Sequence, residues 1–82
     1  MSTVNVSIRY FAQLREQRGL SEESVGTEAK TAARLYQELA SRHSFTLRIG
    51  DLKVAINDAF ASWKSPLKDG DTIVFMPPVV GG

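Results

Sequence analysis

The sequence contains no cysteine and a single histidine. Without cysteine, no disulfide can hold the fold together, so the packing of a hydrophobic core must do so. No thiol is available for nucleophilic, redox or metal chemistry, and one histidine leaves a structural zinc site short of its usual ligands.

An excess of one charge and a long apolar run are also missing. The 10 basic and 9 acidic residues give a net charge of +1, so no strong field attracts nucleic acid or an anionic membrane. The apolar runs are far shorter than the roughly 20 residues that span a bilayer. The N-terminus also lacks the basic and apolar regions of a secretion signal. We therefore expect a cytoplasmic location, with neither nucleic acid nor a membrane as a partner.

The first half of the chain shows the patterns of a strand, a short helix and a weak strand. Residues 3–10 alternate apolar and polar side chains, which is the period of a half-buried strand. Residues 11–18 favour a short helix, and Gly19 occupies the position of a C-terminal cap. Residues 20–28 are mostly polar and suit an edge strand or a loop.

The main helix is predicted over residues 32–42, with Thr31 as its N-cap. Its apolar residues recur at the spacing of one helix face: Ala32, Leu35, Tyr36 and Leu39. An irregular connection follows over residues 41–51. Three further strands are then expected: residues 53–57, a short one around 60–61, and 72–76. Turns are expected at Asn57-Asp58 and over residues 65–67 and 68–71.

One main helix with four or five strands fits a two-layer α+β domain, in which the helix packs across a mixed sheet. The β-grasp, or ubiquitin-like, roll satisfies this description. In that roll the first and last strands pair in parallel at the centre of the sheet, which suits the apolar run over residues 73–76. We expect this domain to occupy residues 1–76 and an extended tail to occupy residues 77–82.

The tail reads Pro77-Pro78-Val79-Val80-Gly81-Gly82. Proline holds φ near its polyproline value, so the two prolines should carry the chain straight off the domain. Glycine has no Cβ and can enter a slot too narrow for other residues. Six extended residues reach about 20 Å. We therefore expect the tail to be inserted into another protein, the alternative being a frayed end without function.

Three segments, in order along the chain, carry a family resemblance: Arg9-Tyr10-Phe11-Ala12-Gln13-Leu14-Arg15-Glu16, then Val54-Ala55-Ile56-Asn57, then Leu67-Lys68-Asp69-Gly70-Asp71 with Phe75-Met76 and the tail. They resemble the Phe-Ala-x-Leu-Arg-Glu, apolar-Asn, Leu-x-Asp-Gly-Asp and Pro-Pro-Val-x-Gly-Gly segments of one family. That family is the small subunit of molybdopterin synthase, a ubiquitin-like sulfur carrier.

The resemblance implies that this chain is not a catalyst and that it carries sulfur in molybdenum cofactor biosynthesis. A partner, an ATP-dependent E1-like adenylyltransferase, would adenylate Gly82. A sulfur donor protein would then convert the adenylate to a thiocarboxylate. The large subunit of a heterotetrameric synthase would pass the sulfur to cyclic pyranopterin monophosphate. The chain has no Walker-type Gly-x-x-x-x-Gly-Lys-Ser/Thr loop, so ATP would be bound by the partner, and we expect this chain to bind neither a cofactor nor a metal.

The resemblance also implies a docking surface for the large subunit beside the tail. By position it would include Phe11, Phe60 and Met76, with Arg15 as a polar contact. The alternative for Phe11 is that it caps the core after the first strand. An exposed aromatic pair of this kind would serve as an interface anchor.

Other functions remain open at this point. Sulfur carriers for the thiazole of thiamin or for cysteine share the fold and the Gly-Gly ending. A protein modifier that forms an isopeptide bond through Gly82, and a β-grasp interaction module that is never activated, are further alternatives.

Three other features have simpler structural interpretations. His43 is interpreted as a solvated residue at the end of the main helix. The acidic residues around Gly70 are interpreted as turn residues, because one short acidic turn offers too few metal ligands. Trp63 is interpreted as a cover over the edge of a small core.

Overall fold

Strand β1 (Val4–Tyr10) forms where the sequence alternates apolar and polar residues. In the computed structural model, which describes residues 3–77, Val6, Ile8 and Tyr10 are buried on one side of this strand. Asn5, Ser7 and Arg9 are exposed on the other side. The period of two in the sequence therefore assigns one face of the sheet to the core.

Two helices follow the predicted boundaries closely. Helix α1 (Ala12–Arg18) ends at Gly19, whose φ of 81° is left-handed, the conformation that glycine adopts at a helix end. Helix α2 (Ala32–His43) begins after Thr31, whose hydroxyl accepts a hydrogen bond from the Arg34 amide at 3.2 Å. The predicted apolar face of α2 is buried. The helix runs one residue past the predicted end, and the expected irregular connection contains a short 3-10 helix, Ile49–Asp51.

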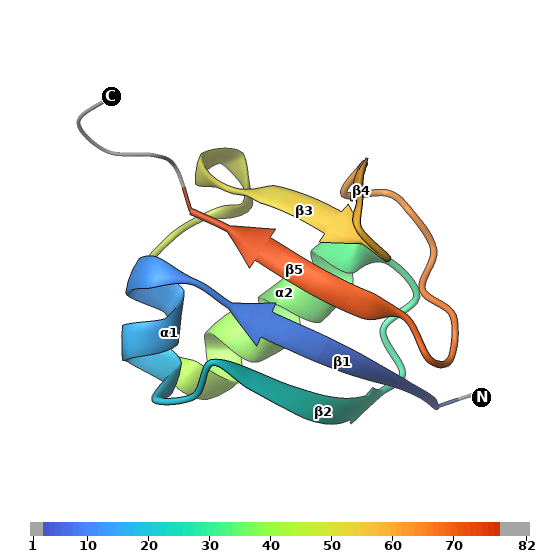
Figure 1. Ribbon diagram of the computed structural model, residues 1–82, viewed down its shortest axis with the longest axis horizontal. Helices are drawn as coiled ribbons and strands as arrows, with labels where there is room; N and C mark the ends of the chain where they lie inside the picture. Colours follow the sequence, from blue (N-terminus) through green and yellow to red (C-terminus); the bar gives the residue numbers. More distant parts are fainter. Residues whose placement is uncertain (1–2, 78–82) are drawn as a thin grey trace.

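The five strands form one mixed sheet in the order β2-β1-β5-β3-β4 (Figure 1). The remaining strands are β2 (Glu22–Thr27), β3 (Lys53–Ile56), β4 (Ala59–Ala61) and β5 (Thr72–Met76). Strands β1 and β5 pair in parallel, with Ile8 opposite Ile73, and the other neighbouring strands pair antiparallel. This is the predicted β-grasp arrangement, with the weak strand β2 at one edge.

The acidic turn before β5 is held by its own side chains. Asp71 is buried, and its carboxylate accepts hydrogen bonds from the Lys68 amide and from the Asn57 side chain, each at 2.9 Å. Asp69 accepts one from the Asn5 amide at 2.8 Å. These bonds tie the turn to β1 and to the β3–β4 connection, which agrees with its interpretation as a structural turn.

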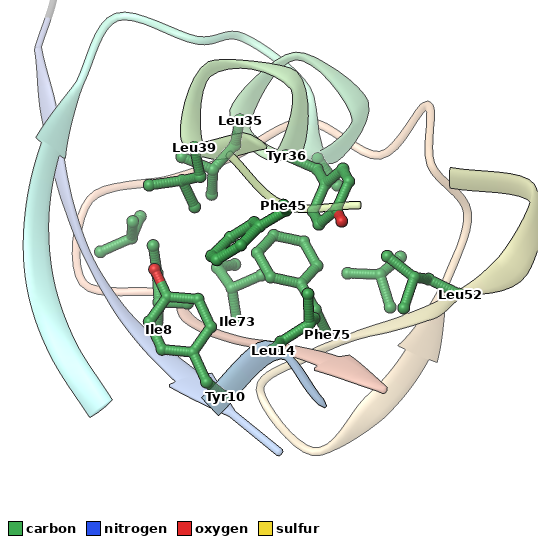
Figure 2. Close-up of a cluster of buried hydrophobic side chains, with 13 residues drawn as sticks. Ile8, Tyr10, Leu14, Leu35, Tyr36, Leu39, Phe45, Leu52, Ile73 and Phe75 are labelled. Atoms are coloured by element: carbon green, nitrogen blue, oxygen red, sulfur yellow. The ribbon is translucent and has the colours of Figure 1, made fainter. Parts of the chain in front are cut away.

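Aromatic rings fill the core between α2 and the sheet (Figure 2). The Phe75 ring is fully buried and lies edge-on to Tyr36, with ring centroids 5.1 Å apart. Trp63 stacks on Phe75 at 5.8 Å and covers the edge of the core, as predicted. His43 is the last residue of α2, as predicted, but it is half-buried rather than fully solvated. Its ring centroid lies 5.8 Å from that of Phe45, and burial lowers its pKa.

Candidate functional site

The face of the sheet turned away from α2, called the outer face below, carries a row of side chains set by strand register. Ala55 lies opposite both Phe60 and Val74, and Val74 lies opposite Arg9. Paired residues on neighbouring strands point to the same side of a sheet. The alternating partners Val54 and Phe75 are buried in the core, so this row belongs to the outer face.

Phe11 joins this row because β1 and β5 run in parallel. Tyr10 lies opposite Phe75, so the residues that follow them, Phe11 and Met76, lie at the same end of the sheet. The parallel pair therefore places the start of α1 beside the point where β5 ends and the tail begins (Figure 1).

Two depressions lie on this side of the molecule and share Phe60 and Met76. The first has a volume of about 300 Å³ and is lined by outer-face residues: Arg9, Phe11, Ala55, Asp58, Phe60, Val74 and Met76. The second has a volume of about 690 Å³ and reaches the root of the tail; its lining is Gly50, Asp51, Leu52, Lys53, Phe60, Met76 and Pro77. Together they form a continuous, largely apolar surface that extends to Pro77, the first residue of the tail.

Two large aromatic side chains on this surface are exposed. The Phe60 residue is 75% exposed and Phe11 is 47% exposed. The Lys53 ammonium lies 5.8 Å from the centroid of the Phe60 ring, within the range of a cation–π interaction. Exposed apolar groups that gather beside a polar rim mark an interaction surface in many proteins.

The structure brings together three of the four predicted docking residues. Phe11, Phe60 and Met76 line the same depression, whereas Arg15 on α1 lines neither of the two. Phe11 does not cap the core, because its ring is half-exposed and the buried side chains at that end are Tyr10 and Leu14.

Sequence reasoning missed the other residues that line this surface: Arg9, Gly50, Asp51, Leu52, Lys53, Ala55, Asp58 and Val74. The signal that could have found them is the alternation of core-facing and outward-facing side chains within the last strand, β5. Once β5 is central and Phe75 faces the core, Val74 and Met76 must face outward. Their neighbours then follow from strand register, which the sequence does not contain.

The tail begins at a rigid position. Strand β5 lies between β1 and β3, and its last residue Met76 is paired with Lys53. Pro77 follows, half-buried, and lines the larger depression. The other predicted tail residues lie outside the described part of the chain: Pro78, Val79, Val80, Gly81 and Gly82.

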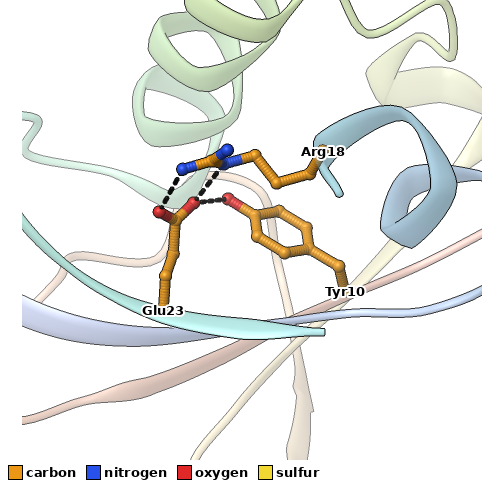
Figure 3. Close-up of polar contacts among 3 residues, drawn as sticks. All are labelled: Tyr10, Arg18 and Glu23. Carbon is orange, nitrogen blue, oxygen red and sulfur yellow. Dashed lines mark hydrogen bonds and ion pairs between the residues drawn. The ribbon is translucent and has the colours of Figure 1, made fainter. Parts of the chain in front are cut away.

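A cluster of three polar residues, called the clasp below, lies on the opposite side of the backbone from Phe11. Glu23 on β2 accepts a hydrogen bond from the Tyr10 hydroxyl at 2.6 Å (Figure 3). Its two oxygens also accept from Arg18 at the end of α1, at 2.9 and 2.8 Å. The clasp thus joins β1, β2 and α1.

The clasp leads to an expected pH dependence of stability. Its hydrogen bonds with Arg18 hold the pKa of Glu23 below the usual value. A carboxyl with a lowered folded-state pKa contributes stability above its unfolded pKa, about 4.3, and this is lost as pH falls through the folded pKa. We expect Glu23→Gln to melt below wild type near neutral pH, with a difference in Tm that shrinks on acidification. Thermal melts by circular dichroism would test this, and a constant difference would contradict it.

Two structural searches of the described residues gave negative results. Between residues 3 and 77, no helix has the length and apolar character needed to cross a membrane. Over the same residues, no three histidine or carboxylate side chains gather where they could hold a metal ion.

Comparison with known proteins gives matches over almost the whole chain. The model of the ThiS family matches residues 8–82. The molybdopterin synthase sulfur carrier subunit of Escherichia coli (strain K12) is 36% identical over 80 residues, which cover 94% of this chain and 99% of that protein. A solved structure of a putative molybdopterin converting factor, subunit 1, from Pyrococcus furiosus is 31% identical, with a TM-score of 0.76 over 93% of this chain and 99% of the other.

A third match comes from a complex. In the structure of subunits 1 and 2 of the molybdopterin-converting factor from Helicobacter pylori, one chain is 30% identical to this one. The match has a TM-score of 0.64 and covers 96% of this chain and 100% of that one. The resemblance found in the sequence is thereby confirmed, and the chain belongs to the ThiS family of sulfur carriers.

Proposed function

We propose that this chain is the sulfur carrier subunit of a molybdopterin synthase. The observation that carries the proposal is the 36% identity to the Escherichia coli sulfur carrier subunit over 99% of that protein. The structure supports it in a second way, because an exposed apolar surface lies beside the root of the tail. A carrier needs both a docking surface and a free end that reaches away from it.

The chemistry follows from the properties of a terminal carboxyl group. With a pKa of about 3.3–3.7, the carboxyl of Gly82 is an anion at neutral pH and a poor electrophile. An ATP-dependent partner transfers AMP to this carboxylate and releases pyrophosphate, which creates an acyl adenylate. A sulfur donor protein then supplies sulfur at the sulfide level, which attacks the acyl carbon, displaces AMP and leaves a thiocarboxylate on Gly82. This chain acts as the loaded substrate of these steps, and the partners supply the catalysis and bind ATP.

Transfer would take place in the large subunit of the synthase. In this proposal Phe11, Phe60 and Met76 dock against that subunit and direct the tail into its active site. The thiocarboxylate sulfur then bonds to cyclic pyranopterin monophosphate, and water cleaves the acyl–sulfur bond, which leaves the sulfur on the pterin and returns Gly82 to a carboxylate. The narrow Gly81-Gly82 end allows the sulfur to approach the pterin closely, because glycine presents no side chain to the walls of the slot.

Mass spectrometry of the chain from its native host would test the loading step. We expect part of the protein to be heavier by the difference between one sulfur and one oxygen atom, with the change located at Gly82. A chain that carries only a carboxylate under every growth condition would contradict the proposal.

The pathway can be tested separately by mixing the chain with candidate acceptors. We expect a complex with the large subunit of molybdopterin synthase and none with a thiazole synthase. The opposite result would assign the chain to thiamin biosynthesis. Covalent conjugates between Gly82 and lysines of other proteins would instead identify a protein modifier.

A further inference from the structure

The backbone on either side of Phe11 is unusually constrained. Strand β1 ends at Tyr10, and Phe11 is the N-cap of α1, with an extended backbone. The next residue, Ala12, has a φ of +51°. This left-handed conformation is unfavourable for a residue with a Cβ, because the Cβ lies too close to the following carbonyl oxygen. Such a conformation persists only where the surrounding structure enforces it.

The surrounding structure enforces it from both sides. Before Phe11, the Tyr10 hydroxyl is held by Glu23 and the Tyr10 amide donates to the Ser21 carbonyl at 2.9 Å. After Phe11, the fully buried Leu14 anchors the middle of α1 and Arg18 anchors its end. Tyr10 and Arg18 both bind the carboxylate of Glu23 (Figure 3). The Glu23 side chain therefore fixes both ends of the segment from residue 10 to residue 18, which contains Phe11.

We propose that Tyr10, Arg18 and Glu23 are positioning residues that hold the Phe11 ring on the outer face before the large subunit docks. The clasp lies on the core side of this segment, whereas Phe11 is half-exposed on the outer side. This inference rests on the proposed docking function. It adds a structural reason why one docking residue, Phe11, is already held in position before binding. Arg18 and Glu23 line neither outer-face depression, so they act through Phe11.

The expected effect on binding follows from the population of the docking-competent position. A ring that is held in place gives the full intrinsic affinity, and a ring that occupies its position for only a fraction of the time weakens apparent affinity by that fraction. Glu23→Gln removes the charge that binds Arg18 in a two-pronged contact. If the competent fraction falls to about one tenth, Kd for the large subunit rises about tenfold.

A double-mutant cycle tests whether this effect passes through Phe11. Kd for the purified large subunit is measured with full-length wild type, Glu23→Gln, Phe11→Ala and the double variant, at a temperature where all are folded. We expect Glu23→Gln to raise Kd about tenfold in wild type. In the Phe11→Ala background it should change Kd by less than about twofold. An equal loss in both backgrounds, or no loss in wild type, would overturn the inference.

Asp69→Asn is the matched control, because this carboxylate also ties β1 but at the end far from Phe11, through the Asn5 amide. It should leave Kd unchanged; a loss as large as that of Glu23→Gln would mean that general weakening of β1 explains both. If Glu23→Gln fails to fold, Arg18→Lys replaces it in the cycle, since lysine keeps the charge but lacks the planar fork. Wild-type chain that does not bind the large subunit would instead refute the proposed function.

Discussion

Deletion of Gly82 is expected to abolish sulfur transfer while the domain remains folded. The deletion moves the terminal carboxyl back by one residue, about 3.3–3.6 Å along an extended chain. A misplacement of about 1 Å at a reacting centre can already cost a factor of about 100 in rate. The rate of sulfur incorporation into cyclic pyranopterin monophosphate, with the reconstituted synthase and activating partner, would measure the effect.

A pair of substitutions at Gly81 separates the length of the tail from its width. Gly81→Phe keeps the length and should block entry into a narrow slot, whereas Gly81→Ala adds one methyl group and should retain more activity. The Gly82 deletion and both Gly81 variants should melt at the wild-type Tm, because Phe75 is the last core residue in the described part of the chain, residues 3–77. Normal transfer by Gly81→Phe would contradict the narrow-slot argument.

Phe60→Ala is expected to weaken binding to the large subunit by about 30-fold, the effect of losing about 2 kcal/mol at an interface anchor. Phe60 is the most exposed of the large apolar residues in the described part of the chain and borders both depressions. Its truncation removes no core contact, so the free energy of unfolding should change by less than about 0.5 kcal/mol. Isothermal titration with the purified large subunit would measure Kd.

Leu20→Ala is the matched control for this experiment. Leu20 is also a large exposed apolar residue, at 42%, but it lines neither depression. Its substitution should leave Kd within about twofold of wild type, as expected for a surface residue outside the interface. Equal losses for Phe60→Ala and Leu20→Ala would show that the outer face is not the docking surface.

Much of the fold could be predicted because local patterns and tertiary packing agree. The alternation in β1 matches its burial, and Thr31 and Gly19 cap the helices at the expected positions. The parallel pairing of β1 with β5 was predictable because a central strand is buried, which suits the apolar run that ends at Met76.

The features that could not be predicted depend mainly on contacts between segments that lie far apart in the sequence. Arg9, Ala55 and Val74 meet on the outer face through strand register, and no local pattern records it. The clasp likewise joins three elements, and its residues look like ordinary surface charges in the sequence. The left-handed Ala12 is a third case, since nothing in an alanine predicts a positive φ.

A single-turnover experiment tests the central claim most directly. The chain is prepared with a thiocarboxylate at Gly82 and mixed with the large subunit and cyclic pyranopterin monophosphate, without ATP or the activating partner. The account predicts that the pterin gains sulfur while the mass of the chain falls to that of the carboxylate form. A chain that binds the large subunit but keeps its sulfur, with the pterin unchanged, would contradict it.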